Sequence, residues 1–579
     1  MTEAATGEIR PADSEAERGA AEWPLRPWLL AGLFGLAGLL IHLVTHEHET
    51  VAWRAAVAGF VFFGSIAAAF TLEPGRWKAP SAFALAIGAV MAGLAWRAVQ
   101  YGDYLPDEQY GFASGVVASA LALPLFQAEF YRRRFATPYS EIYGHVWTDA
   151  ISAAGALAFT GISWIVFGLM SELFALLKIE LLRELMDKGW FGWTFSGLAA
   201  GAALGTIRNQ LRILATMQTV VLLVASLLAV PLAVGLVVFL LATAVSGPQV
   251  LWDATRSATP LLLGCAAGSF VLANAIARQD DEAMTRSRVM RVAGWVLAAV
   301  ILPLAVFAAV SMGLRLNQYG LAPERLWGLV AIVVACVCGV GYWVALARGR
   351  MRGWAGYLRK ATFHFALFVC GLAVLLALPI LDFAAISASN QVARLQSGKV
   401  PVTEFDFAAL RWDFGDAGKR ALRRLAKSGN AQIAEHARIA LAQTEEPHVP
   451  RGERVRAAED FNLRMQPDDP ALRKLVLDHL VSNPWQCEER CFALDLGPGE
   501  AGTRRVAIVR DGAYDVVLLA SGKEGITLHE DFPHGSPLTD QSKVEVRTAP
   551  ARFIFIDGKR VGLVVPETST PLEASPPRR

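Results

Sequence analysis

Long apolar segments separated by short polar connections occupy the first two thirds of the chain. A helix needs about 20 apolar residues to cross a bilayer. Windows of that kind without any Asp, Glu, Lys or Arg occur eleven times, at 28–44, 55–72, 79–96, 110–128, 150–170, 190–206, 219–245, 258–277, 292–312, 326–347 and 361–381. The pattern therefore predicts eleven membrane-spanning helices over residues 27–381.

The helix boundaries need closer consideration at two places in this pattern. The longest contains Pro231, and no polar turn separates its halves, so we expect one kinked span rather than two. Between the fifth and sixth windows, leucines from Leu173 to Leu185 recur on one helical face. This segment, 171–188, is either a short amphipathic helix on the membrane surface or a prolongation of the fifth span.

Basic residues between the windows predict the orientation in the membrane. With the N-terminus in the cytoplasm, the connections on the inner side carry 19 Lys and Arg residues and those on the outer side carry 8. Cytoplasmic connections are enriched in basic residues, so this orientation is the expected one. It predicts a polar cytoplasmic tail over 1–26. Because the number of spans is odd, residues 382–579 then lie outside, in the periplasm of a bacterium with two membranes.

Beyond residue 381 the pattern is that of a water-soluble region. Residues 382–480 have helical periodicity and include a helix pair joined at Ser428-Gly429-Asn430. Short β-branched and aromatic segments separated by Gly and Asp turns follow in 481–566, which predicts a small antiparallel sheet. The tail 567–579 is rich in Pro, Ser and Thr, and we expect it to be disordered. The predicted fold class is mainly α, a polytopic transmembrane helical bundle with a C-terminal periplasmic α+β domain.

Composition supports a division near Leu381. Charged residues number 42 in 27–381 and 55 in the shorter segment 382–579. Over the whole chain 18% of residues are charged, against about 25% in average soluble proteins. These values exclude a wholly soluble enzyme and a disordered chain. The net charge of +2, without a long basic block, excludes a nucleic-acid binder built on a basic surface, so the expected partner is the lipid bilayer.

Two cysteines, Cys487 and Cys491, lie in the region expected outside the membrane. Neighbouring cysteines in an oxidising compartment commonly pair, so these two are a disulfide candidate. Free thiols are one alternative. A zinc site with His529 and His534 is another, because two cysteines and two histidines form a zinc ligand set. We assign no metal site, no cofactor and no catalytic residue, and the other four cysteines lie in the apolar windows.

The most unusual charges are arginines on the outer side, where basic residues are disfavoured. They belong to a candidate site near the connection after the ninth span and just after the eleventh, made of Arg315, Asn317, Tyr319, Arg325, Asp382, Asn390 and Arg394. We expect the arginines to contact an anionic group, such as a lipid phosphate at the outer leaflet. The alternative is that they dock the soluble region through salt bridges with Asp382, Asp406 or Asp413.

The same residues carry a resemblance to a known family. The stretches RLNQYGLAPERLW, from Arg315, and NQVARLQSGKVPVTEFDFAALRWDFGDAGKRAL, from Asn390, resemble a bacterial multi-pass inner-membrane family known only as a domain of unknown function (DUF4153). The resemblance covers roughly residues 25–430. It implies an integral membrane protein of the bacterial envelope. The family has no established activity, so the resemblance implies no catalytic residue.

No sequence motif identifies a reaction. The windows hold no Asp, Glu, Lys or Arg, and their histidines are limited to His42 and His364, whereas ion-coupled pumps usually hold ionisable groups in the membrane. We therefore expect a non-enzymatic envelope protein that scaffolds, senses or handles a lipid or small molecule, with a transporter as the first alternative. A glycosyltransferase using a lipid-linked sugar is the second, with outer-loop carboxylates from Glu47, Glu49, Asp103 or Asp107.

Overall fold

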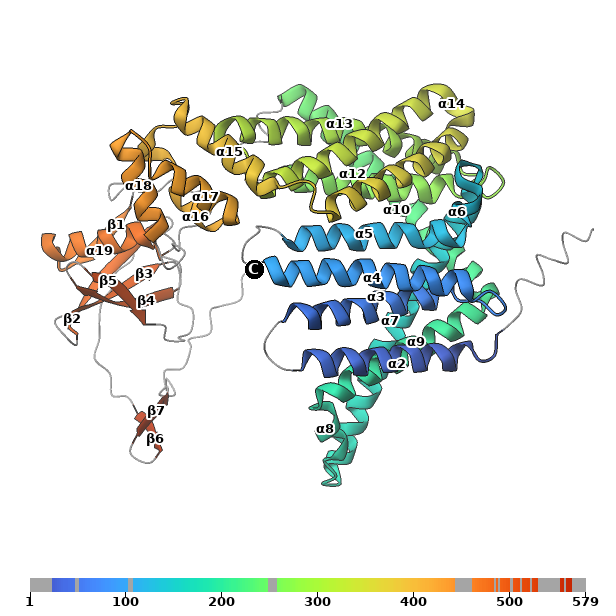
Figure 1. Cartoon of the computed structure of the whole chain (residues 1–579), viewed down its shortest axis with the longest axis horizontal. Coiled ribbons are helices and arrows are strands. Elements are labelled where there is room, and N and C mark those ends of the chain that lie inside the picture. Colours follow the sequence, from blue (N-terminus) through green and yellow to red (C-terminus); the bar gives the residue numbers. More distant parts are fainter. Residues whose placement is uncertain are drawn as a thin grey trace, which may run out of the picture. The chain divides into compact units, whose positions relative to one another are not determined.

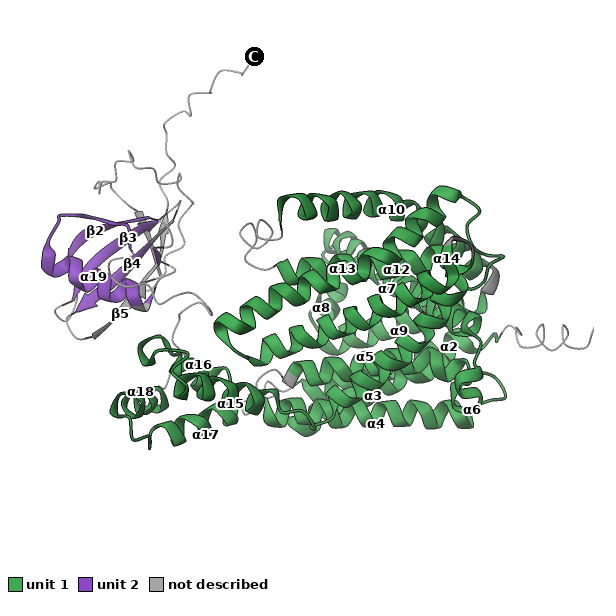
Figure 2. Ribbon diagram, turned by 90° about the horizontal axis from the view of Figure 1, so that it is seen from above, with its two compact units in different colours: residues 1–443 green, residues 444–579 purple. Residues whose placement is uncertain are grey.

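The computed structural model describes residues 23–46, 51–102, 108–247, 258–442, 461–483, 486–487, 490–499, 503–510, 513–520, 523–528, 552–556 and 559–564. The chain forms two compact units, Met1–Gln443 and Thr444–Arg579 (Figure 2). Each unit is described below by itself. The predicted tails, 1–26 and 567–579, lie almost wholly outside the described residues.

The first unit is helical and contains both the long apolar helices and a set of shorter ones. Its helices are α2 (Arg26–Thr45), α3 (Ala52–Thr71), α4 (Lys78–Tyr101), α5 (Glu108–Gln127), α6 (Phe130–Arg133), α7 (Tyr139–Leu176), α8 (Leu181–Met186), α9 (Gly189–Asn209), α10 (Leu211–Ser246), α12 (Ala258–Ala277), α13 (Arg288–Tyr319), α14 (Pro323–Ala377), α15 (Phe383–Gln396), α16 (Phe407–Trp412), α17 (Gly415–Leu425) and α18 (Ala431–Ala442), with 3-10 turns η1 (Arg134–Ala136) and η2 (Val402–Glu404). Figure 1 shows α2 to α5 side by side in the bundle.

The long helices match the predicted windows. Each window falls largely on a helix, and ten helical segments of the described residues are long and apolar enough to cross a membrane. Helix α10 continues through Pro231 as a single helix, as predicted. The last two windows share α14, whose halves meet at a kink where Arg350 has a φ of 47°.

Helix α9 is the window that does not belong to those ten. It has 21 residues, but its five glycines make it less apolar. Three of them allow close packing on α2. A Cβ added at Gly197, Gly201 or Gly205 would lie 2.1–2.5 Å from α2 backbone atoms. Small residues at every fourth position let two helix backbones approach in this way. The count of eleven spans therefore stays a prediction, with α9 as the segment in question.

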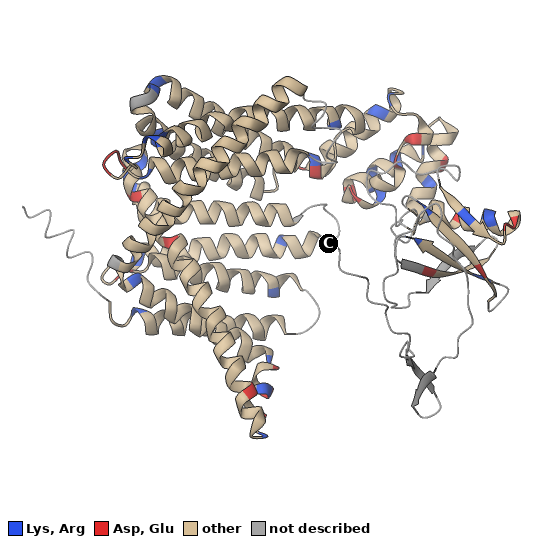
Figure 3. Cartoon of the chain, turned by 180° about the vertical axis from the view of Figure 1, so that it is seen from behind, with Lys and Arg blue, Asp and Glu red and all other residues tan. Residues whose placement is uncertain are grey.

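The outside of the bundle is apolar. Large side chains that are more than half exposed include Leu157, Ile165, Leu169, Val238 and Leu241. Charged residues lie mostly toward the ends of the helices (Figure 3). A soluble protein rarely exposes such a continuous apolar surface, and a bilayer requires one. The first unit therefore has the surface of a membrane protein.

In the segment 171–188, the fifth predicted span is prolonged and a short separate helix follows, whose predicted position on the membrane surface stays a prediction. Helix α7 continues to Leu176, which prolongs the fifth span, and the chain turns at Lys178 with a φ of 59°. The short helix α8 follows before α9 begins. Leu176 is 81% exposed, so the tip of this hairpin presents apolar side chains.

The described residues of the second unit form a five-stranded sheet, one helix and a separate pair of strands. Its elements are β1 (Leu463–Gln466), α19 (Pro470–Ser482), β2 (Cys491–Pro498), β3 (Arg504–Arg510), β4 (Ala513–Ala520), β5 (Lys523–Leu528), β6 (Arg552–Ile556) and β7 (Lys559–Val564). The sheet order is β1-β2-β3-β4-β5, antiparallel except for the parallel β1–β2 pair, and β6–β7 form a separate hairpin. Val476 and Leu480 of α19 pack against Val506 in its core. Part of the predicted sheet region 481–566, including residues 529–551, lies outside the described residues.

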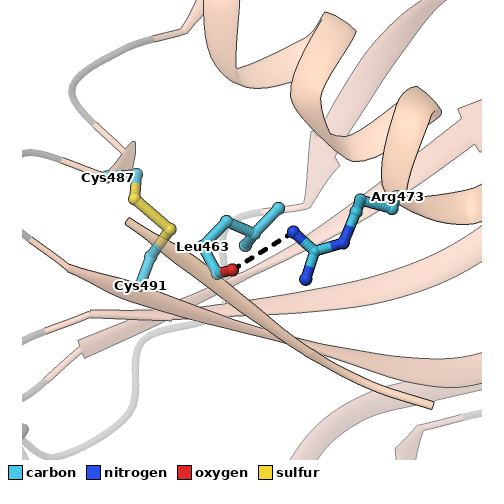
Figure 4. The surroundings of a disulfide bond; sticks show 4 residues. All are labelled: Leu463, Arg473, Cys487 and Cys491. Carbon is cyan, nitrogen blue, oxygen red and sulfur yellow. Dashed lines mark hydrogen bonds between the residues drawn. A yellow bond between two sulfur atoms is a disulfide. The ribbon is translucent and has the colours of Figure 1, made fainter. Parts of the chain in front are cut away.

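Cys487 and Cys491 form a disulfide bond in this unit. Figure 4 shows it beside β1, where Arg473 of α19 donates to the carbonyl oxygen of Leu463 at 3.4 Å. Both cysteines are buried in the core that β1, α19 and the central strands share. Residues 463–482, which the sequence grouped with the helical region, pack here with the sheet. The predicted helix pair corresponds to α17 and α18 in the first unit.

Candidate functional site

The predicted site residues surround the turn between α13 and α14. Helix α13 ends at Tyr319, Gly320 follows with a φ of 73°, and α14 begins at Pro323. Helix α15 begins after Asp382, whose carboxylate accepts a hydrogen bond from the backbone N–H of Ala385 at 2.8 Å. This places α15 beside the turn. We call this end of the bundle the outer end and the end where α2 begins the inner end, after the predicted orientation.

Side chains of α15 hold the turn through its backbone. Arg394 donates to the carbonyl oxygens of Asn317 at 3.0 Å and Gln318 at 2.7 Å. Gln391 donates to the carbonyls of Tyr319 and Leu321, and Asn390 accepts from the N–H of Leu321 at 3.0 Å. The last carbonyls of a helix lack partners within the helix, and cations there also meet the negative end of its dipole. We call these contacts the outer clamp.

Gly320 and Arg325 complete the outer clamp from the side of the turn. A Cβ at Gly320 would lie 2.8 Å from both Arg394 Cδ and Gln391 Nε2. Arg325, in the first turn of α14, donates to the carbonyl of Gly320 at 2.7 Å and lies over the ring of Tyr319. Only glycine combines the positive φ with this close approach.

The structure therefore brings together five of the seven predicted site residues in the contacts of the outer clamp, namely Asn317, Tyr319, Arg325, Asn390 and Arg394. Arg325 and Arg394 donate to backbone carbonyls. Asp382 and Asp406, two of the carboxylates considered as salt-bridge partners, cap the N-termini of α15 and α16. Arg315 is half-buried near the end of α13, before its last turn, and adds its charge to that of Arg325.

A second group of polar residues lies near the inner end, and the sequence did not predict it. We call it the inner cluster: Gln127, His145, Asp149, Ser152 and Arg208. Asp149 lies on α7 and is only 8% exposed. Within the part of the chain that the structure describes, neither oxygen of its carboxylate has a hydrogen-bond partner of good geometry, and the Ser152 hydroxyl and the Gln127 carbonyl oxygen are also buried without one. Buried polar atoms are nearly always hydrogen-bonded in folded proteins, so this concentration of unsatisfied acceptors is unusual.

Arg208 ties the inner ends of several helices together. Its Nη1 donates to the carbonyl of Ala69, in the last turn of α3, at 2.6 Å, and its guanidinium lies over the ring of Phe70. Arg26 of α2 donates to the carbonyl of Arg208 at 3.1 Å. The amide nitrogen of Gln127, at the end of α5, donates to the carbonyl of Phe70 at 2.9 Å. These contacts fix the surroundings of Asp149 without supplying a donor to it.

A third group, near the inner end of α12 and α14, is fully hydrogen-bonded. Asn274 donates to the hydroxyl of Tyr342 at 2.6 Å, Tyr342 bonds to Thr362 at 2.8 Å, and Thr362 donates back to Asn274 at 3.1 Å. Tyr342 is completely buried. Arg359 donates to the carbonyls of Ala277 and Arg278, at the end of α12. The ring of contacts joins α12 to both halves of α14 and leaves no acceptor unmet in its centre.

The sequence reading missed the inner cluster because the windows were defined as charge-free. The window 150–170 begins directly after Asp149, and 190–206 ends just before Arg208. The helices continue past both boundaries. The expectation that the spans hold no acidic or basic residue is therefore wrong for α7. Apolar positions before and after Asp149 at helical spacing, Ile142 and Ala156 among them, were the available signal.

Several residues considered in the sequence lie outside the described part of the chain. They are Glu47, Glu49, Asp103 and Asp107, which a glycosyltransferase would use, and His529 and His534 of the zinc alternative. Among the residues that the structure describes, no group of three His, Cys, Asp or Glu side chains is placed to hold a metal ion.

Comparison with known proteins adds one match. The model of a family described as "Domain of unknown function" (DUF4153) matches residues 55–425. This range includes the bundle from α3 onward, the outer clamp, the inner cluster and most of the shorter helices that follow, and it leaves out α2. No curated protein and no solved structure matches the chain.

Proposed function

The chain belongs to the DUF4153 family, and we propose that it is an integral protein of a bacterial inner membrane that handles a small molecule, an ion or a lipid through its helical bundle. The inner cluster carries this proposal. A scaffold needs only satisfied polar groups or none in its interior. Ionisable groups kept inside a membrane protein commonly mark a ligand, ion or proton pathway. Asp149 is such a group.

The proposed orientation places the N-terminus in the cytoplasm and α15 onward, with the sheet unit, in the periplasm. Two observations support it: the 19 basic residues on the inner side against 8 on the outer, and the disulfide bond, which is typical of oxidising compartments. Reporter fusions after residues 290, 355 and 400 test it. We expect cytoplasmic signals at the first two and a periplasmic signal at the third, and a cytoplasmic signal at 400 would reverse the assignment.

A deletion strain tests the handling function without knowledge of the ligand. Its envelope lipids, glycans and soluble metabolite pools are compared with those of the parent strain. We expect a change that the wild-type gene and the Asp281→Asn variant restore, because the Asp281 side chain is exposed and lies outside the inner cluster. The Asp149→Asn variant should restore it less. Identical profiles in the deletion strain and parent would contradict the proposal, and a change confined to lipid-linked sugars would favour the glycosyltransferase.

An anionic lipid at Arg315 is a second proposed partner. Arg394 and Arg325 already donate to carbonyls in the outer clamp, whereas no hydrogen bond or ion pair of Arg315 is found among the described residues. A lipid phosphate at the outer leaflet has the charge that a guanidinium recognises. Native mass spectrometry should detect retained anionic lipid on the wild-type protein and less on Arg315→Gln. Equal retention by both would exclude this site.

A further inference from the structure

The most informative residue of the inner cluster is Asp149 because it combines burial, an apolar setting and unmet oxygens. It lies on α7, ten residues after the helix begins at Tyr139. Ala153 and Ala156, one and two turns further on, contact an apolar core with Leu30 of α2 and Leu204 of α9. Its carboxylate is therefore held at the inner rim of that core rather than in solvent.

Among the described residues, the groups that face Asp149 make their hydrogen bonds of good geometry to other acceptors. Arg208 of α9 is the nearest cation that acts on it, but its Nη1 donates to the carbonyl of Ala69, and no ion pair between the two side chains is found among the described residues. Gln127 of α5 reaches toward the carboxylate, but its amide nitrogen donates to Phe70. Ser152 lies on the same helix face, three residues on, and its hydroxyl is also buried without a partner.

Other charged and titratable groups complete the surroundings. His145 lies one turn before Asp149 on α7 and is influenced by Arg208, Glu73 and Glu141. Arg26 of α2 acts on Arg208, and Glu73, just after α3, acts on both. The cluster thus already holds cations, which disfavours a bound metal ion. A buried carboxylate without a donor or cation in contact is costly, and protonation removes the cost.

We propose that Asp149 is a proton-binding site of the bundle, protonated in the resting protein. This deepens the proposed handling function and rests on it only for the use of the proton. On release, the O–H bond of the carboxyl group breaks and the proton passes to water at the inner end. The carboxylate then attracts Arg208, which exchanges the carbonyl of Ala69 for Asp149. Because Arg208 holds the end of α3, the exchange links the protonation of Asp149 to the packing of α3 against α9.

Infrared spectroscopy of the full-length protein in lipid nanodiscs tests the site directly. A protonated carboxyl group has a C=O stretching band distinct from that of a carboxylate. At pH 7 the wild-type protein should show this band, Asp149→Asn should lack it, and the matched control Asp281→Asn should keep it. Raising the pH should abolish the band in the wild-type protein. A wild-type protein without the band at pH 7, or a band that Asp149→Asn retains, would overturn the proposal.

The melting temperature provides a second measurement, which distinguishes a protonated Asp149 from an ionised Asp149 paired with Arg208. Asparagine has nearly the shape of a protonated aspartate, so Asp149→Asn should melt within a few degrees of the wild-type protein when Asp149 is protonated. If Asp149 were instead ionised and paired with Arg208, the substitution would leave a buried cation unpaired and lower the melting temperature strongly. If the band is present but the deletion strain shows no altered profile, the handling function fails and the proton site stands. If the band is missing but the strain is altered, only the proton site fails.

Discussion

The two ends of the helical bundle use arginine in the same way but leave different groups unsatisfied. In the outer clamp, Arg394 and Arg325 donate to the carbonyls that end α13 and begin the turn to α14. In the inner cluster, Arg208 donates to the carbonyl of Ala69 near the end of α3. At the outer end these carbonyls have donors, and the atom left buried without a partner among the described residues is a donor, the Nε of Arg394. At the inner end a buried carboxylate remains beside Arg208 without a donor.

This difference distinguishes polar groups that packing explains from a polar group that packing does not explain. Carbonyl oxygens at a helix end need donors wherever the end is shielded from water. An arginine that supplies these donors therefore has a structural role. Asp149 satisfies no such need, because neither of its two oxygens accepts a hydrogen bond of good geometry from the described residues. The fully bonded ring of Asn274, Tyr342 and Thr362 shows that this bundle can bury polar side chains without unmet acceptors. The exception at Asp149 therefore needs a separate explanation.

The largest expected effect comes from separating α9 from α2, which would disrupt the end of the bundle that holds the inner cluster. Gly205→Leu would place a side chain where a Cβ already lies 2.5 Å from the Cα of Pro27. Backbone atoms cannot move aside as a flexible side chain can. We therefore expect the free energy of unfolding to fall by about 3 kcal/mol or more, or the variant to fail to fold. Thermal unfolding in detergent measures it. The control is Gly168→Leu on α7, where no atom lies within 4 Å of the added Cβ. Similar melting temperatures for the two variants would refute close packing of α2 and α9.

The second prediction concerns the outer clamp. Arg394→Ala leaves the carbonyls of Asn317 and Gln318 without their donor, and charge-assisted hydrogen bonds contribute about 1.5–3 kcal/mol each when buried. Because both acceptor residues are exposed, water can replace part of the lost hydrogen bonding. We therefore expect the docking of α15 to weaken by about 2 kcal/mol. It should appear as faster amide exchange in α15, with the inner helices unchanged. Lys399→Ala, which removes one exposed hydrogen bond to Asn317, is the matched control and should change exchange little. Unchanged α15 exchange in Arg394→Ala would disprove the docking role.

The sequence predicted the helices better than it predicted the contacts between them. Apolar windows locate helices because membrane crossing requires length and hydrophobicity, and α10 follows this rule through Pro231. The same criterion hid Asp149, since a window chosen for lack of charge must stop beside any buried charge. It also could not show that Arg394 reaches carbonyls from a helix more than 70 residues further along the chain, because backbone acceptors leave no mark in a sequence. Likewise β1 contains only four residues and pairs with a strand more than 20 residues later, too short a segment for its alternation to be recognised.

The smallest expected effect concerns a carboxylate that is paired with a cation and can therefore be compared with Asp149. Asp495 of β2 accepts hydrogen bonds from Arg504 of β3 and from the N–H of Gly497. The Arg504 guanidinium, and after it the Gly497 N–H, lower the pKa of Asp495 below its ordinary value. A group with a lowered folded-state pKa stabilises the fold above its unfolded pKa, which is about 3.9 for aspartate, and this contribution is lost as the pH falls through the folded value.

Asp495→Asn should therefore weaken β2–β3 pairing by about 1 kcal/mol at pH 7, and the difference from the wild-type protein should vanish in strong acid, where both side chains are neutral. The ratio of amide-exchange rates in β3 between variant and wild-type full-length protein measures it, since the ratio removes the intrinsic pH dependence of exchange. Asp149→Asn should show the opposite behaviour, with little loss at neutral pH because the native group is already neutral there. A loss at pH 7 as large for Asp149→Asn as for Asp495→Asn would mean that the inner carboxylate is paired after all, and the two ends of the bundle would then follow one rule.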